Sequence, residues 1–273
     1  MNGDRFTVLG VRIDDLDDAT LDAKIEEMLR SPVPQLVVTP NPEFVLQAQE
    51  DPAFLRLLEV SHLSLPDGVG LRYGVRALSG RRLMYRHAGV DVLVRLAALC
   101  QTRGERLALV GGLSGTAVKT ADRLRQQFPG LEVLGINPGE MVGDSERVLV
   151  PIDLTSLLNT FAPAVLAVGL GQGKQERTIL TLFKQVPSVR IGIGVGGSFD
   201  TLSGRFARAP LFFRTSGLEW VWRLCLQPSR WKRIYRATIV FPLRVARTAI
   251  KQGRFLAACR DVLPEVLHQL SGK

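Results

Sequence analysis

The sequence predicts an α/β fold with a Rossmann-like, mainly parallel sheet and helices on both faces, followed by a basic helical C-terminal appendage. Three observations lead to this prediction. Short apolar runs alternate with segments of helical periodicity through the first two thirds of the chain. Most of these runs end in glycine, proline or asparagine, as buried strands do where they turn into helices. Beyond residue 204 the alternation stops and arginine and tryptophan become frequent, so we divide the chain into a domain over residues 1–204 and an appendage over residues 205–273.

Length and composition are those of a globular protein. The chain has 273 residues, of which 46% are hydrophobic, enough for a substantial core. The chain has three cysteines, Cys100, Cys225 and Cys259. Their number is odd and their spacing is not that of a metal site, so we expect neither a disulfide framework nor a zinc site. We therefore expect the protein to reside in a reducing cytoplasm. The N-terminus shows no signal-peptide pattern. Residues 154–173 are uncharged, but proline, glycine and polar residues interrupt them, so we interpret them as a helix end and a buried strand rather than a membrane span.

The first elements are a strand or hairpin arm over residues 6–13 and a helix that Asp17 or Asp18 can cap. The preceding Asp15-Leu16-Asp17 run looks like the metal-binding Asp-X-Asp of many sugar-nucleotide enzymes. Acids are expected in the first turn of any helix, where the macrodipole favours negative charge. We therefore predict no metal site there.

A short strand over residues 35–38 runs into Thr39-Pro40-Asn41-Pro42. Asn41 as N-cap and Pro42 in the first turn are typical of a helix start. A hydroxyl and an amide thus lie where a strand ends and a helix begins, which suits an anion or a sugar. Simple capping explains the same residues.

The next strand ends in Leu65-Pro66-Asp67-Gly68, and a helix follows over residues 69–78. In open parallel sheets the carboxyl ends of the strands line the crevice where ligands bind, so Asp67 is a candidate catalytic carboxylate. The alternative is an ordinary turn, because proline, aspartate and glycine are also turn residues.

The remaining strands are predicted over residues 106–110, 131–135, 164–169 and 189–195, with helices over residues 90–100, 117–124 and about 144–161 and another after the loop at residues 169–176. Two of the strands end in glycine-rich turns. The turn over residues 111–116, which begins with Gly111, could cradle a phosphate, but it lacks the spacing of a dinucleotide fingerprint. The loop over residues 169–176 carries Gly171, Lys174 and Gln175, which suit a diphosphate and a base or sugar.

The appendage is strongly basic. Between residues 205 and 260 there are thirteen lysines and arginines and one acid, Glu219, so the net charge of this segment is +12. The net charge of the whole chain is +9, so the rest of the chain has a net charge of −3. All three tryptophans lie among these arginines, and two short helices and a longer one, broken at Pro228 and Pro242, are the predicted arrangement. Such a segment fits an anionic partner: lipid headgroups, diphosphates or nucleic acid. It could dock on a membrane or pack on the body with a solvated basic face.

Taken in order, these stretches resemble the WecG/TagA/CpsF family of bacterial glycosyltransferases over about residues 6–236. The resemblance rests on seven motifs: Thr39-Pro40-Asn41, Leu65-Pro66-Asp67-Gly68, residues 86–89, residues 169–176, residues 194–200, Arg208-Ala209-Pro210 and Gly217-Leu218-Glu219-Trp220. It implies inverting transfer of a sugar, N-acetylmannosamine or another hexose, from a UDP-sugar to a polyprenyl-diphosphate-linked sugar. The product would enter a cell-surface polysaccharide or teichoic-acid-type polymer. The resemblance implies no metal and no cofactor.

Matched residue by residue, the resemblance implies that Asp67 is the general base. It places Thr39, Asn41, Arg86 and Gln175 near the donor. Gly111, Gly171 and Lys174, from the glycine-rich turns, complete the expected donor site, and five arginines are expected at the lipid diphosphate of the acceptor: Arg208, Arg214, Arg223, Arg230 and Arg233. Two positions depart from the family pattern, because Gly173 stands for the usual proline and Gln227 for a frequent glutamate.

The expected partners are the UDP-sugar, the lipid-linked acceptor and an anionic membrane surface, with the protein peripheral on the cytoplasmic face of the inner membrane. We expect no nucleic-acid partner, and a homo-oligomer is compatible with the sequence. Two alternatives remain open from the residues alone. One is a nucleic-acid-binding protein that uses the arginine and tryptophan residues of the appendage, and the other is a nucleotide-cofactor oxidoreductase. The acidic body and the missing dinucleotide fingerprint argue against them.

Overall fold

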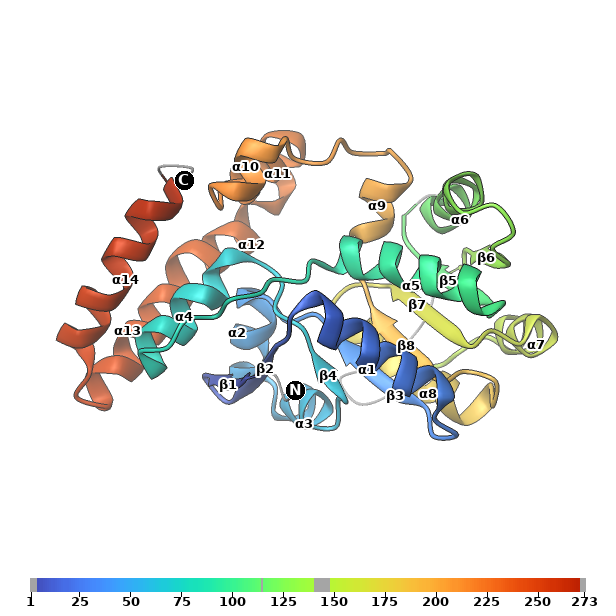
Figure 1. Ribbon diagram of the computed structural model, residues 1–273, viewed down its shortest axis with the longest axis horizontal. Coiled ribbons are helices and arrows are strands. Elements are labelled where there is room, and N and C mark those ends of the chain that lie inside the picture. Colours follow the sequence, from blue (N-terminus) through green and yellow to red (C-terminus); the bar gives the residue numbers. More distant parts are fainter. Residues whose placement is uncertain (1–3, 114, 140–147, 271–273) are drawn as a thin grey trace.

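Six parallel strands form the centre of the structure, a computed structural model that describes residues 4–113, 115–139 and 148–270. The strand order is β4-β3-β8-β7-β5-β6, and every neighbouring pair is parallel (Figure 1). The strands are β3 (Gln35–Val38), β4 (Leu63–Ser64), β5 (Leu107–Gly111), β6 (Val133–Ile136), β7 (Val165–Gly169) and β8 (Ile191–Gly194). The predicted α/β fold with a mainly parallel sheet is confirmed.

Helices cover both faces of this sheet. Successive residues of a strand point to opposite faces, so Val37 belongs to one hydrophobic layer and Leu36 and Val38 to the other. The first layer includes α1 (Asp18–Arg30), α5 (Gly89–Arg103) and α6 (Thr116–Gln127). The second includes α2 (Pro42–Glu50), α3 (Pro52–Glu59), α7 (Ile152–Phe161) and α8 (Lys174–Gln185). Burial on both faces explains why the strands read as continuous apolar runs rather than alternating ones.

The N-terminal segment is a hairpin of β1 (Asp4–Val8) and β2 (Val11–Asp15), as one of the two sequence alternatives predicted. Asp17 then caps α1 by accepting the Thr20 N–H at 2.7 Å. The hairpin is tied to the edge of the sheet, because Asp14 Oδ2 accepts the N–H of Ser64 in β4 at 2.9 Å. The acidic end of the hairpin therefore lies beside the strand that leads to Asp67.

The carboxyl ends of the parallel strands meet at one edge of the sheet. From β5 the chain passes through α6 to β6, and from β7 it passes through α8 to β8 on the opposite side, so a topological switch point lies between β5 and β7. Gly111 has φ +103°, and a Cβ there would lie 2.9 Å from the Gly169 carbonyl oxygen, so only glycine fits. Ser114, within the predicted phosphate turn, lies outside the described residues.

The appendage packs on α4 (Val69–Ser79) rather than on the sheet (Figure 1). After α9 (Ser198–Leu202), it comprises α10 (Leu211–Thr215), α11 (Glu219–Leu226), η1 (Pro228–Arg230), α12 (Trp231–Tyr235), η2 (Arg236–Val240), α13 (Phe241–Lys251) and α14 (Phe255–Leu270). Helix α13 buries Phe241, Val245 and Ala249. Because these side chains join the same hydrophobic cluster as the second layer of the body, the appendage is part of the packed core.

Two sequence predictions about helix boundaries are wrong. Pro242 does not break the appendage, because it lies in the first turn of α13, directly after a π-helical turn over Arg236–Val240. A π turn is wider than an α turn and makes room for a residue that lacks an N–H. The helix expected over residues 144–161 begins only at Ile152, since Pro151 is extended and disfavours helix in the residue before it. Residues 144–147 of that prediction lie outside the described part of the chain.

Candidate active site

A cleft of about 480 Å³ lies between the strand ends of the body and the appendage. Asn41, Asp67 and Arg86 line it from the body. Arg223, Arg230 and Arg233 line it from the appendage. The structure thus brings together six of the residues that the sequence singled out, from Asn41 to Arg233, which are 192 positions apart in the chain.

Asp67 is placed by the backbone around it. Its N–H donates to the Pro40 carbonyl at 2.8 Å, and the carbonyl of the preceding Pro66 accepts the His87 N–H at 3.0 Å. These bonds tie the strand ends of β3 and β4 to the segment that carries Arg86. Burial raises the pKa of the Asp67 carboxyl, whereas the charges of Arg86 and Arg223 lower it, and the net direction is upward from its ordinary value. A carboxylate with a raised pKa is a better general base at neutral pH than an exposed one.

The chain on either side of Arg86 is held by Asp15, the last residue of the N-terminal hairpin, and by Leu16, which follows it. The buried Asp15 accepts the N–H groups of Met84 and Tyr85 at 2.9 and 2.8 Å, and His87 Nε2 lies 2.7 Å from the Leu16 carbonyl oxygen. The connector between α4 and α5 is therefore fixed on either side of Arg86. Sequence reasoning had dismissed Asp15 as a metal ligand without finding this role, and no local signal marks it.

Glu219 belongs to the motif at residues 217–220, but the sequence analysis gave it no role in the site. At the start of α11 it accepts from Arg86 at 3.3 Å and from Arg223 at 2.9 Å. Burial raises its pKa, but the charges of Arg223 and Arg86 prevail and hold the pKa below its ordinary value. The ionised carboxylate fixes both guanidinium groups beside Asp67. The available signal was its isolation, since it is the single acid among thirteen basic residues.

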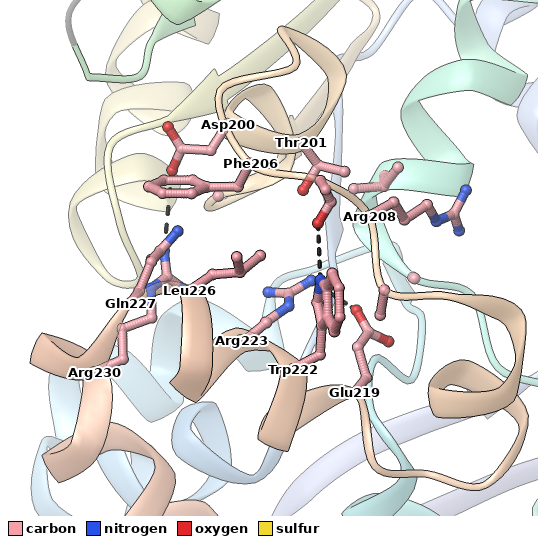
Figure 2. Close-up of a pocket in the computed structure, with 15 residues that line it drawn as sticks. Asp200, Thr201, Phe206, Arg208, Glu219, Trp222, Arg223, Leu226, Gln227 and Arg230 are labelled. Atoms are coloured by element: carbon pink, nitrogen blue, oxygen red, sulfur yellow. Dashed lines mark hydrogen bonds and ion pairs between the residues drawn. The ribbon is translucent and has the colours of Figure 1, made fainter.

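Other arginines tie the appendage to the body. Arg233 contacts both carboxylate oxygens of Glu43, with its Nε 2.9 Å from Oε2, and Arg230 lies 3.9 Å from Asp200 of α9. A smaller cavity beside the cleft has Arg230, Arg223 and Trp222 on one side and Asp200 on the other (Figure 2). Arg208 lines this smaller cavity and pairs with Asp91 at 2.6 Å, whereas Arg214 lines neither cavity.

Five of the expected donor residues do not line the cleft: Thr39, Gly111, Gly171, Lys174 and Gln175. Thr39 is buried and donates its hydroxyl to the Gly194 carbonyl at 3.1 Å, which links β3 to β8. Within the cleft, Asn41 caps α2 through the N–H groups of Glu43 and Phe44. Capping and ligand binding are compatible for Asn41, because the cap uses its oxygen and leaves its amide nitrogen.

Gln175 and Glu176 join two glycine-rich loops. Gln175 accepts the Gly196 N–H at 3.0 Å and donates to Glu176 at 2.6 Å, and Glu176 accepts the Gly173 N–H at 2.6 Å. Both side chains are almost fully buried, so this network sets the path of the loops after β7 and β8. Burial raises the pKa of Glu176 to about 7 despite these hydrogen bonds.

We expect the titration of Glu176 to be visible in protein stability. Between pH 4.5, its ordinary pKa, and pH 7 the folded protein binds more protons than the unfolded chain, so the free energy of unfolding falls as pH rises. Over this range the contribution of Glu176 is about 3 kcal/mol. Urea denaturation at pH 5, 6, 7 and 8 measures it, and Glu176→Gln should lack this part of the pH dependence. Identical pH profiles for the two proteins would contradict the assignment.

Carboxylates near the strand ends are used by the protein itself. Asp15 accepts two backbone N–H groups and Asp17 caps α1. Among residues 4–113, 115–139 and 148–270, no group of three histidine, cysteine, aspartate or glutamate side chains is arranged to hold a metal ion. The Asp-X-Asp run thus has a structural role.

Comparison with known proteins places this site in context. The model of the glycosyl transferase WecG/TagA/CpsF family matches residues 6–255. The chain is 33% identical over 198 residues to an N-acetylglucosaminyldiphosphoundecaprenol N-acetyl-beta-D-mannosaminyltransferase of Bacillus spizizenii. The aligned residues are 72% of this chain and 74% of the relative. The protein of the same name from Bacillus subtilis is 32% identical over 199 residues, with 73% and 74% covered. That from Staphylococcus aureus is 27% identical over 257 residues, with 92% and 95% covered.

Proposed function

This chain belongs to the WecG/TagA/CpsF family of glycosyltransferases, and we propose that it transfers N-acetylmannosamine from its UDP derivative to N-acetylglucosamine on undecaprenyl diphosphate. The relatives' names and the extent of their similarity support this choice of substrates. The observation that carries the proposal is Asp67 in a cleft with four arginines, which combines one base with the cations that two diphosphates need. The product would be a lipid-linked disaccharide for a teichoic-acid-type polymer.

Asp67 is the general base in this proposal. Its carboxylate takes the proton of the acceptor hydroxyl as that oxygen attacks C1 of the donor sugar. The bond between C1 and the diphosphate oxygen breaks, and its electron pair leaves with UDP. A single displacement of this kind inverts the anomeric centre and requires one carboxylate.

The arginines stabilise the charge that develops on the leaving diphosphate. Arg86 and Arg223 lie next to Asp67 and are oriented by Glu219, so we assign them to the diphosphate of the donor. Arg230 of η1 and Arg233 of α12 line the same cleft, and we assign them to the diphosphate of the acceptor. Asn41 and the glycine-rich ends of β5 and β7 complete the proposed donor side, with Thr39 and Gln175 supporting it from within the fold.

Mass spectrometry of the lipid product tests the proposal. The protein is incubated with undecaprenyl-diphosphate-linked N-acetylglucosamine and, in separate reactions, with UDP-N-acetylmannosamine, UDP-N-acetylglucosamine and UDP-glucose. We expect a mass increase of one N-acetylhexosamine with UDP-N-acetylmannosamine and little with the other two. Faster transfer from another donor would overturn the proposed substrate, and no transfer from any donor would overturn the reaction.

An apolar stripe on the appendage supports peripheral docking on an anionic membrane. Trp231, Tyr235, Ile239 and Leu243 are all exposed and follow one another at intervals of four residues. Arg244, Arg247 and Lys251 come directly after them along α13. In the part of the chain that the structure describes, no helix has the length and apolarity of a membrane span. We propose that the stripe enters the interface on the cytoplasmic face of the inner membrane and holds the cleft near its lipid acceptor.

We expect the double variant Trp231→Ser, Leu243→Ser to lose binding to phosphatidylglycerol vesicles by at least tenfold, since two large apolar side chains no longer enter the bilayer. Co-sedimentation with vesicles measures the loss. Ile152→Ser is the matched control, because Ile152 is 83% exposed on α7 at the far end of the molecule (Figure 1). Equal binding by the double variant and the control would contradict the proposed surface.

A further inference from the structure

Helix α14 begins where the match to the family model ends. The model matches residues 6–255, and α14 spans Phe255–Leu270. The helix nevertheless reaches the cleft, because Val266 is among the side chains that line it. Part of the wall of this active site therefore comes from a segment outside the matched family residues.

Two arginines of α4 hold α14 in place. Arg76 donates from its Nε to the Asp261 carbonyl at 3.2 Å and lies 3.9 Å from the Asp261 carboxylate. Arg72 and Arg76 lie 3.9 and 4.0 Å from Glu265, one turn farther along α14. The next turn brings Gln269 opposite Tyr73, which is also on α4. Helix α14 is thus fixed along α4 as far as the cleft.

Gln269 connects three segments at the cleft. Its Oε1 accepts the Tyr73 hydroxyl at 2.9 Å, and its Nε2 donates to the Thr215 carbonyl at 3.4 Å. Gly217, in the turn after α10, has φ +73°, a backbone conformation that favours glycine. A Cβ at this position would lie only 2.9 Å from Gln269 Nε2, so the turn passes close to the side-chain amide of Gln269. Two residues later the same turn reaches Glu219, which orients Arg86 and Arg223. Gln269 therefore supports the turn that carries this acid.

The cleft has an apolar as well as a cationic lining. Val69, Ile234, Ala237, Pro242 and, from α14, Val266 line it together with Arg86, Arg223, Arg230 and Arg233. A cleft that combines cationic and apolar side chains fits a diphosphate that carries a hydrocarbon chain. A nucleotide sugar has no comparable apolar part, so the apolar lining suits the lipid-linked acceptor and not the donor.

We propose that Gln269 is a positioning residue for the lipid-linked acceptor, and that α14 forms the wall against which the first isoprenoid units of that acceptor lie. The inference rests on the proposed function for the identity of the acceptor. Gln269 holds Tyr73 on one wall of the cleft and the 215–219 turn on the other. Loss of its two hydrogen bonds releases the turn and loosens the wall that α14 forms.

Steady-state kinetics with Gln269→Leu, which keeps the size of the side chain and removes both hydrogen bonds, tests this role. We expect the KM for the lipid acceptor to rise about three- to tenfold, because one or two hydrogen bonds that hold the acceptor wall are lost. The KM for the UDP-sugar should stay within about twofold of the wild-type value. Tyr73→Phe should raise the acceptor KM in the same way, and the double variant should add little to either single change. Leu263→Gln, at an exposed position of α14, is the matched control and should leave both KM values unchanged. A merely structural defect would lower kcat through loss of active enzyme and leave the acceptor KM as it was.

Hydrogen exchange of the unliganded protein separates this inference from the proposed function. Gln269→Leu should speed amide exchange in residues 215–223, and Leu263→Gln should not. If the wild-type protein transfers sugar but Gln269→Leu leaves the acceptor KM unchanged, the positioning role is overturned and the proposed function stands. If the wild-type protein transfers no sugar, the proposed function fails, and unchanged exchange in residues 215–223 would then overturn the role of Gln269 as well.

Discussion

Replacing Asp67 by Asn should lower kcat for sugar transfer by a factor of about 10²–10⁴, because the acceptor hydroxyl loses the group that takes its proton. The amide has nearly the shape of the carboxylate and can still accept from the Gly89 N–H, so the loop should remain in place. Isothermal titration with UDP-sugar should therefore give an affinity close to that of the wild-type protein. Asp153→Asn, an exposed position on α7, is the control for removal of one negative charge.

The pH dependence of the reaction distinguishes a base from a residue that only binds substrate. Since burial raises the pKa of Asp67, the acid limb of kcat/KM should lie above the ordinary carboxyl value of 3.8. Glu219→Gln removes a neighbouring negative charge that also raises this pKa, so it should move the acid limb to lower pH. The assignment of Asp67 as the general base would be refuted if Asp67→Asn kept the kcat of the wild-type protein. It would also be refuted if Glu219→Gln left the acid limb of kcat/KM at the same pH.

Replacing Phe241 by Ala should lower the free energy of unfolding by about 3–5 kcal/mol, the usual loss for a large aromatic side chain in a packed core. Phe241 is 1% exposed, and its ring lies so close to α4 that a Cβ on Gly74 would approach it to 3.1 Å. Urea denaturation followed by circular dichroism measures the loss. Leu256→Ala, on α14 where the side chain is 83% exposed, should change stability by less than about 0.5 kcal/mol.

Equal stability of Phe241→Ala and Leu256→Ala would show that α13 does not belong to the core. The burial of Phe241, Val245 and Ala249 also decides how the appendage should be studied. Truncation after residue 204 would uncover the apolar face of α4, against which α13 and α14 pack, so loss of membrane binding could not be distinguished from loss of folding. Point changes on the exposed stripe avoid this problem, because they leave the buried face of α13 intact.

Local sequence patterns were enough to predict the structural elements that depend only on residues close together in the chain. The cap of α1 by Asp17 and the cap of α2 by Asn41 involve residues within three positions. Asn41 was predicted, and Asp17 was one of the two caps predicted for α1. Buried parallel strands are short apolar runs wherever they occur, so the sheet was predictable as well. The boundary errors came from two prolines, Pro151 and Pro242, whose effect depends on the helical geometry around them.

The sequence by itself also determined the family, through motifs that keep their order along the chain, and that resemblance led to the proposed roles of Asp67 and Arg86. Only the tertiary structure decided how these residues are held. Asp15 fixes the connector that carries Arg86 from about 70 positions away, and Glu219 reaches Arg86 across 133 positions. Gln269 meets Tyr73 across 196 positions. Periodicity and capping rules act over one or two turns of helix, so contacts at such separations leave no local trace, and they arise only when the packed core brings the segments together.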